Sequence, residues 1–336
     1  MHTRFATAAT ASVLISAPIM ASSNASFQSV GLLPGATSTF VYSMSADGNA
    51  IVGRSGTTAF LWTPDSGILG LGKLTPSPGD ISSSTAQTIS ADGTVIAGQN
   101  LINMPDCPCT DAFAVRWTAP FTTIEALPGL SNIDVSSNVY DITENGSILV
   151  GQSRGDDGAG RSVRWSGSTI ELLLPGQIFE VGVVWSIADD GSVALGQGSG
   201  QYWVASAPDF TAEIMMVPTQ LIPFVKQLSP DGSLAVGSSL SSSTRATLFN
   251  HATGTATVLL DCVPGNDAAT DISADNSIVV GTRATGQSPD ALIWYDIEQC
   301  AMSIKDRLTN EFGLNLAGWE LSEAVAVSAD GTTIAG

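Results

Sequence analysis

The sequence predicts an all-β protein, a β-propeller of seven four-stranded blades in which the last blade is truncated. Three observations lead to this prediction. A turn motif recurs seven times, an aromatic strand follows six of these turns, and successive turns are 41 to 55 residues apart. A fixed period of this length is that of a supersecondary unit, and four short strands per unit are typical of a propeller blade.

The recurring motif is Ser-Ala-Asp-Gly or a close variant, with a closing glycine five residues after the turn glycine, as in Gly48 and Gly53. Asp-Gly and Asn-Gly accept positive φ at both central positions of a type I′ turn, whose twist suits a β-hairpin. We therefore expect each copy to join the first and second strands of a blade. The predicted turn residues are Asp47, Gly48, Asp92, Gly93, Asn145, Gly146, Asp190, Gly191, Asp231, Gly232, Asp275, Asn276, Asp330 and Gly331.

A third strand with an aromatic residue follows each of the first six hairpins. A column of aromatic side chains could stack on a ligand, but its repetition in six units favours a packed layer between adjacent sheets. A fourth strand then ends each unit, as in residues 123–127. The predicted aromatic column is Trp62, Trp117, Trp165, Trp203, Phe249 and Trp294.

The two ends of the chain predict how the ring closes. A lone strand of the fourth type, residues 27–33, precedes the first full unit, and the chain ends after two strands of the seventh. The N-terminal strand would complete the last blade, which then lacks only its aromatic third strand. A parallel β-helix is the main alternative, but its rungs are shorter and need no Asp-Gly hairpin.

Composition limits the classes of function. The chain has 336 residues, of which 43% are hydrophobic and 13% charged, and its net charge is −19. The apolar content is sufficient for a buried core, so a disordered chain is excluded. We expect no nucleic-acid partner, because an acidic surface repels the phosphate backbone.

Residues 1–25 read as a secretory signal peptide. Arg4 supplies a weak positive start, an apolar stretch follows, and cleavage is expected after Ala21 or Ala25. A disordered tail or a core helix is the alternative. Residues 26–336 would then form a single exported propeller domain, extracellular or at a bacterial cell surface, without a transmembrane segment in the mature chain.

Four cysteines fit an oxidising compartment. Cys107 and Cys109 flank a proline, and Cys262 and Cys300 lie 38 residues apart. We interpret them as possible disulfides, 107–109 and 262–300, since no second pair of ligands has the spacing of a zinc site.

The repeat units resemble the HAF repeats of bacterial extracellular proteins. The resemblance rests on units such as Ser45–Gly53 followed by Ala59-Phe60-Leu61-Trp62, and on residues 308–321, which look like the final unit of such proteins. It covers residues 27–336. In that family the final unit often precedes a PEP-CTERM sorting signal, and some relatives continue into an autotransporter barrel. The resemblance implies no catalytic residue.

The sequence singles out no catalytic, cofactor-binding or metal-binding residue. His251 is the single histidine after residue 25 and lies in a predicted turn. Because the loop between the second and third strands varies in length, we expect one face of the disc to carry variable loops, including residues 100–111, and to bind a glycan or protein ligand. The predicted function is an extracellular or surface binding or structural module; the sequence favours a role other than catalysis but does not decide whether the protein is an enzyme. A carbohydrate-active enzyme with carboxylates on the propeller face and an autotransporter passenger are the alternatives.

Overall fold

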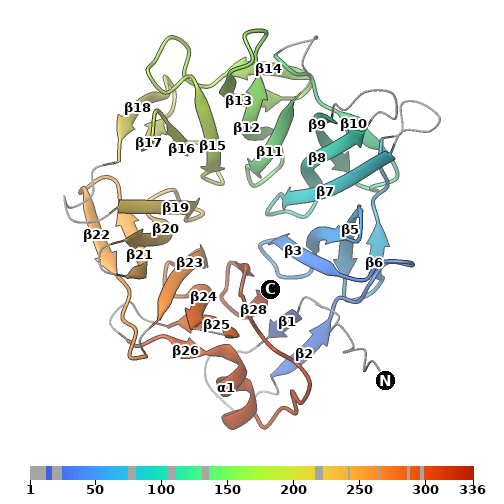
Figure 1. Cartoon of the computed structure of the whole chain (residues 1–336), viewed down its shortest axis with the longest axis vertical. Coiled ribbons are helices and arrows are strands. Elements are labelled where there is room, and N and C mark those ends of the chain that lie inside the picture. The colour runs from blue at the N-terminus through green and yellow to red at the C-terminus, as the bar shows by residue number, and fades with distance from the viewer. Residues whose placement is uncertain are drawn as a thin grey trace, which may run out of the picture.

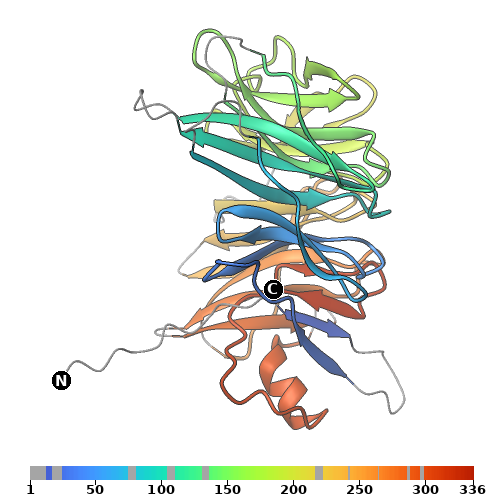
Figure 2. The same ribbon diagram turned by 90° about the vertical axis from the view of Figure 1, so that its right-hand side faces the viewer.

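The computed structural model of the chain describes residues 13–16, 25–74, 81–103, 110–130, 136–215, 222–240, 243–263, 265–285, 288–295 and 299–336. Its strands form four-stranded antiparallel sheets that stand side by side around a central axis (Figure 1). Seen from the side, the sheets form a disc with hairpins and loops on both faces (Figure 2). The prediction of an all-β propeller with four-stranded blades is confirmed.

Six blades consist of four consecutive strands, ordered from the channel outward. The first three are β3 (Thr39–Met44), β4 (Ile51–Ser55), β5 (Thr58–Thr63) and β6 (Gly67–Gly70); β7 (Ile81–Ile89), β8 (Val95–Asn103), β9 (Thr110–Thr118) and β10 (Ile124–Ala126); and β11 (Ser137–Ile142), β12 (Ile148–Arg154), β13 (Gly160–Ser166) and β14 (Thr169–Leu172). The next three are β15 (Gly182–Ile187), β16 (Val193–Gly198), β17 (Gln201–Ser206) and β18 (Thr211–Ile214); β19 (Ile222–Leu228), β20 (Ala235–Leu240), β21 (Thr244–Asn250) and β22 (Thr255–Val258); and β23 (Asn266–Ile272), β24 (Val279–Thr285), β25 (Ser288–Trp294) and β26 (Met302–Ser303).

The remaining sheet combines both ends of the chain. Its order is β27 (Ala326–Val327), β28 (Thr333–Ala335), β1 (Val13–Ser16) and β2 (Ser26–Ser29). As predicted, an N-terminal strand takes the fourth position, although β2 is shorter than the expected 27–33. The expectation of a missing third strand is wrong for this structure, because β1, which lies within the predicted signal peptide, occupies that position.

Within the described residues, one short helix, α1 (Ile304–Asn310), interrupts the all-β pattern. The Ser303 side chain caps it by accepting a hydrogen bond from the backbone N–H of Asp306. Ile304 and Leu308, one turn apart, are buried against the last two sheets. No described helix has the length and apolarity needed to cross a membrane.

Backbone hydrogen bonds join the hairpin turns of most neighbouring blades around the channel. Ala46 N–H donates to Ala91 O, Glu144 N–H to Asp189 O, and Ala329 N–H to Ala46 O. The last of these bonds links the composite sheet to the first blade. Pro230 occupies the equivalent place in the fifth blade and has no N–H to donate.

The core consists of separate apolar clusters between adjacent sheets. The cluster between the first two blades, for example, combines Val52 and Leu61 with Ile96, Val115 and Trp117. Buried apolar surface therefore holds each blade to its neighbour and leaves a channel along the axis.

Candidate functional site

The repeated Asp-Gly motif forms a turn of a different type from the one predicted. The Gly48 N–H donates to Ser45 O at 2.9 Å, so Ala46 and Asp47 are the central residues. Of the three residues Ala46, Asp47 and Gly48, only Gly48 has a positive φ. The expectation of a type I′ turn centred on Asp-Gly is therefore wrong, because the loop has four residues and only the third needs the left-handed region.

The same geometry recurs in the other copies. Each turn glycine has φ between 69° and 75°, and Asn276, which replaces glycine in one copy, has φ 61°. Asn tolerates this region better than other residues with a side chain.

The aspartate and serine of the motif stabilise the loop through their side chains. Ser45 Oγ donates to Asp47 Oδ1 at 2.6 Å and accepts from Ala50 N–H, while Asp47 Oδ1 also accepts from Asn49 N–H. Partial burial raises the pKa of Asp47, but these hydrogen bonds outweigh it, so the pKa lies below its usual value. The aspartates equivalent to Asp47 in the described turns thus have a structural role.

The closing glycine of each unit is required by a close backbone approach. A Cβ at Gly53 would lie 1.9 Å from Phe40 O, and a Cβ at Gly151 would lie 2.0 Å from Asn138 O. At this point the first strand of each full blade carries a β-bulge, which presses its backbone against the second strand. In the composite sheet, a Cβ at Gly336 would likewise lie 2.0 Å from Glu323 O.

The six predicted aromatic side chains, Trp62, Trp117, Trp165, Trp203, Phe249 and Trp294, are all buried. Five of them pair with the residue two places before the closing glycine, as Trp117 does with Ile96. Trp203 departs from this column, because it pairs with the closing Gly196 itself and Ala205 takes the expected place. Trp117 Nε1 donates to Leu71 O of the preceding blade at 2.8 Å, whereas Trp203 Nε1 has no partner among the described residues.

The cysteines divide into two cases. Cys262 and Cys300 form a disulfide that links the end of the fifth blade to the sixth. Cys107 and Cys109 lie outside the described residues. The expectation of a loop over residues 100–111 is too long, because β8 extends to Asn103 and β9 begins at Thr110, and these two residues pair.

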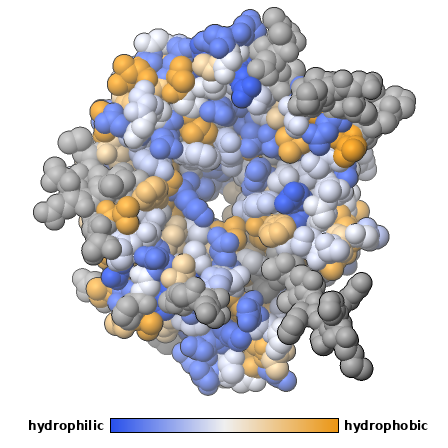
Figure 3. All heavy atoms as spheres, viewed as in Figure 1, coloured by the Kyte–Doolittle hydropathy of each residue, from blue (hydrophilic) through white to orange (hydrophobic). Residues whose placement is uncertain are grey.

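A cavity of about 1230 Å³ occupies the central channel. The channel is open at its centre in the space-filling view (Figure 3). The bulged residues of the inner strands line it, and they differ from blade to blade. These residues are Tyr42, Gln87, Tyr140, Trp185, Lys226 and Thr270.

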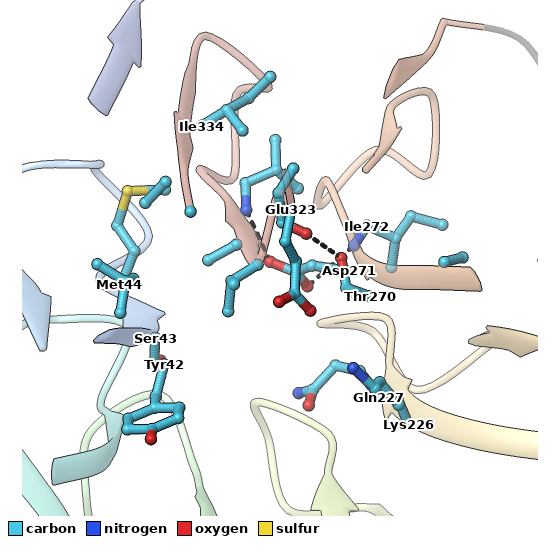
Figure 4. A pocket seen from close by; sticks show the side chains of 18 of the residues that line it. Tyr42, Ser43, Met44, Lys226, Gln227, Thr270, Asp271, Ile272, Glu323 and Ile334 are labelled. Atoms are coloured by element: carbon cyan, nitrogen blue, oxygen red, sulfur yellow. Dashed lines mark hydrogen bonds between the residues drawn. The ribbon is translucent and has the colours of Figure 1, made fainter. Parts of the chain in front are cut away.

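Aromatic side chains of the inner strands line this cavity, some near the start of a strand and others at the bulge. Phe40 and Phe224 are 41% and 47% exposed and line the same cavity. The rings of Tyr140 and Trp185 lie 4.8 Å apart between neighbouring blades. Lys226, Gln227, Asp271 and Glu323 also line the cavity (Figure 4). The channel therefore combines exposed ring faces with amide, amine and carboxylate groups.

Two inner-strand aspartates join neighbouring blades at the channel wall. Asp141 Oδ2 accepts from Ser186 Oγ and Ile187 N–H of the next blade, at 2.7 and 2.9 Å. Asp271 Oδ2 accepts from Val327 N–H at 2.8 Å in the same arrangement (Figure 4). These two occupy equivalent registers, opposite Val150 and Val280 respectively.

Three aspartates of the channel wall, Asp141, Asp189 and Asp271, have raised pKa values. Burial raises the pKa of Asp271 to about 7, and the charges of Asp141 and Asp189 add to this effect. Burial, with the charges of Asp141, Glu144 and Asp190, raises the pKa of Asp189 to about 6. Burial also raises the pKa of Asp141, against the hydrogen bonds it accepts. Part of this wall is therefore protonated near neutral pH.

Sequence reasoning did not find these channel acids, although a signal was present. Asp141 and Asp271 each lie two residues before the first residue of the turn motif in their repeat. Along the chain, this position holds Ser43, Thr88, Asp141, Ser186, Gln227, Asp271 and Ala326. It is polar in six copies, and an apolar residue follows it in each of these six. Aligning the repeats beyond the turn would have shown it.

The described residues contain no group of three or more His, Cys, Asp and Glu side chains placed to hold a metal. His251 Nε2 lies 2.8 Å from Gly232 O, in the turn region where the sequence placed it.

No protein-family model matches the chain, and no curated protein matches it. Solved structures match its fold. A puromycin hydrolase is 10% identical, with a TM-score of 0.59 over 83% of this chain and 48% of that one. Oligogalacturonate lyase from Vibrio parahaemolyticus is 11% identical, with a TM-score of 0.50 over 79% of each chain. TolB from Acinetobacter baumannii is 13% identical, with a TM-score of 0.49 over 78% of this chain.

This chain spans 62% of TolB and about half of the puromycin hydrolase. At these identities the similarity shows the β-propeller fold alone. The HAF-repeat resemblance stays a prediction.

Proposed function

We propose that this protein is an exported binding module of the HAF-repeat type, which takes a neutral glycan chain into its channel, where aromatic side chains line the wall. The observation that carries the proposal is the set of ring faces on the inner strands, Phe40, Tyr42, Tyr140, Trp185 and Phe224, which line one cavity. Concave sites with aromatic walls and a few convergent polar groups are typical ligand sites.

The chemistry of the wall favours a neutral sugar. Ring faces stack on the apolar faces of pyranose rings, while the amide of Gln87 and the amine of the exposed Lys226 offer groups that pair with hydroxyls. An anionic ligand would meet the carboxylates of Asp271 and Glu323 in a protein of net charge −19.

Titration of the full chain with neutral hexasaccharides, followed by tryptophan fluorescence and calorimetry, tests the proposal. We expect saturable binding that Trp185→Ala weakens at least tenfold. Leu69→Ala, at an exposed position on an outer strand, is the matched control and leaves affinity unchanged. Absence of binding to neutral and acidic oligosaccharides alike would overturn the proposal in favour of a structural module.

A carbohydrate-active enzyme is the second candidate, and Asp271 is the observation that favours it. A carboxyl with a pKa of about 7 in a cavity could act as a general acid. Its two oxygens already accept the backbone N–H groups of Ile272 and Val327, which favours a structural role. Oligosaccharide cleavage that is lost in Asp271→Asn while binding persists would establish the enzyme.

The proposal that the protein is exported rests on its N-terminal sequence. N-terminal sequencing of the protein secreted by a bacterial host tests it, with a new terminus at Ser22 or Ser26 as the expected result. An intact Met1 on the released protein would contradict it.

A further inference from the structure

The cavity of the central channel reaches both faces of the disc. At one end it is lined by Phe40 and Phe224, which lie near the starts of their inner strands. At the other end it is lined by a collar of turn residues, the second residue of the motif in five copies: Ala46, Ala91, Asp189, Pro230 and Ala329. The view along the axis shows a clear opening through the molecule (Figure 3). The cavity is therefore a passage and not a blind pocket.

The passage has the width of a single extended chain. From Phe40 to Ala46 an inner strand and its turn cover about 20 Å, at a rise of about 3.3 Å per residue. A cavity of about 1230 Å³ spread over this length has a mean cross-section of about 60 Å². A β-strand with its side chains occupies a similar area, about 4.8 by 10 Å within stacked sheets. The passage therefore suits one unbranched polymer chain.

The lining changes from one end of the passage to the other. Exposed rings such as Phe40 and Phe224 line the first part, and the bulged residues, among them Gln87, line the middle. In the collar, three of the five side chains are alanines, and one is a proline. A polymer that stacks on the rings thus meets small side chains at the far end, which leave it room to emerge.

The wall of the passage is closed on all sides. A buried apolar cluster lies at each junction between neighbouring sheets. In the collar, backbone hydrogen bonds such as Ala329 N–H to Ala46 O join the turns. Pro230 has no N–H for the equivalent bond to the sixth blade, and the Cys262–Cys300 disulfide joins these two blades. A polymer can therefore enter the channel by one of its ends and not sideways between two blades.

We propose that an unbranched neutral glycan threads the channel from face to face and leaves both of its ends free. The inference rests on the proposed function, since it takes the same class of ligand and the same aromatic wall. It adds that the protein recognises the interior of a chain and is held on it by topology as well as by contacts. A glycan bound by one end, or laid across one face, would contradict it.

The test uses the full, unchanged chain and two soluble probes, linear dodecasaccharides of β-1,3-linked and of α-1,4-linked glucose, each with biotin at both ends. Monovalent streptavidin is a stopper too large for the channel, and its bond to biotin is among the tightest known. The stopper is added either before the protein or after the complex has formed. Tryptophan fluorescence measures binding, and size-exclusion chromatography after dilution measures retention. The matched control is the same glycan with biotin at one end only.

We expect a glycan stoppered at both ends beforehand to bind at least tenfold more weakly than the open glycan, because neither end can enter. Stoppers added to the formed complex should slow its dissociation at least a hundredfold. The control with one biotin should bind and dissociate like the open glycan in both orders of addition, because one end always remains free to enter and leave.

Equal binding of the glycan stoppered beforehand would overturn the proposal, since the ligand would then lie across a face. A complex that later stoppers fail to retain would also overturn it, since the bound end would not emerge on the far side. Both results leave glycan binding itself intact. Failure of both open glycans to bind, in contrast, would overturn the proposed function together with this proposal.

Discussion

The hydroxyl of Ser186 in β15 donates a hydrogen bond of 2.7 Å to Oδ2 of Asp141 in β11, across the boundary between the third and fourth blades. Ser186 Oγ in turn accepts from Leu228 N–H of the fifth blade at 3.1 Å. The Gln227 side chain also donates to Asp141 Oδ2, at 3.1 Å. One buried carboxylate therefore connects the inner strands of three consecutive blades.

Asp141→Ala should destabilise the protein by about 3 kcal/mol, because it leaves the N–H groups of Ile142 and Ile187 without their acceptor. Urea denaturation measures the loss. Asp65→Ala, at an exposed turn position, is the control and should change stability by less than about 0.5 kcal/mol. If both variants behave alike, the inner-strand carboxylate does not hold the blades together.

Stability should fall as the pH rises from about 4 to about 7. Asp271 ionises near its ordinary pKa of 3.8 when the chain is unfolded, but its pKa is about 7 when folded, so the folded state binds the proton more tightly in this window. Below about pH 4 the turn aspartates reverse this trend. Their pKa values are lowered in the folded state, so stability is lost as the pH falls and they become protonated. The optimum is therefore mildly acidic.

Denaturation midpoints at pH 5 and pH 8 test this dependence. Asp271→Asn removes one titrating group, so the fall between the two values should be smaller than in the unchanged protein. It should not vanish, because Asp189 has a raised pKa of about 6 and still titrates in the same range. An identical fall in both proteins would show that Asp271 ionises normally.

Gly151→Ala should destabilise the protein by about 1–3 kcal/mol, since the new Cβ would lie 2.0 Å from Asn138 O and force the bulged strand away. Gly70→Ala is the matched control, because its Cβ would meet Leu33 at an ordinary 3.5 Å and its φ is not positive. Thermal unfolding distinguishes the two. A tolerated alanine at 151 would mean that the closing glycine reflects flexibility and not close approach.

The sequence predicts the fold well because the repeat is local. Asp-Gly hairpins, closing glycines and third-strand aromatics each report on residues within one blade, and together they define four strands per unit. The position of β2 in the composite sheet also follows, since a ring must close on itself. Helix α1 was missed because it interrupts the repeat after β26, where the unit no longer applies.

The channel was harder to predict, because it depends on contacts between blades. Asp141 meets Ser186 and Gln227 only after three blades are arranged side by side. The displaced Trp203 has a similar origin, since Phe179 and Phe210 fill the cluster beside it and its register is two residues from that of the other aromatics. The periodicity of a single unit predicts neither the contacts of Asp141 nor the shifted register of Trp203.

Trp117→Phe should cost more stability than Trp203→Phe, by about 1–2 kcal/mol. Both rings are fully buried, so the loss of apolar volume is similar. Trp117 Nε1, however, donates to Leu71 O, and phenylalanine would leave that carbonyl without its donor. Trp203 Nε1 has no partner to lose among the described residues. Chemical denaturation of the two variants checks the difference, and a larger loss for Trp203→Phe would contradict this account.

Removal of the Cys262–Cys300 disulfide should destabilise the protein by about 3–4 kcal/mol. The bond closes a loop with a sequence separation of 38 residues, and it restricts the unfolded chain over that length. The double variant Cys262→Ser with Cys300→Ser isolates this effect and avoids a free thiol. Its denaturation midpoint should equal that of the unchanged protein under reducing conditions, provided that the reductant breaks this bond alone. A double variant as stable as the oxidised protein would show that the apolar cluster between the fifth and sixth blades, which includes Leu259 and Trp294, holds this junction by itself.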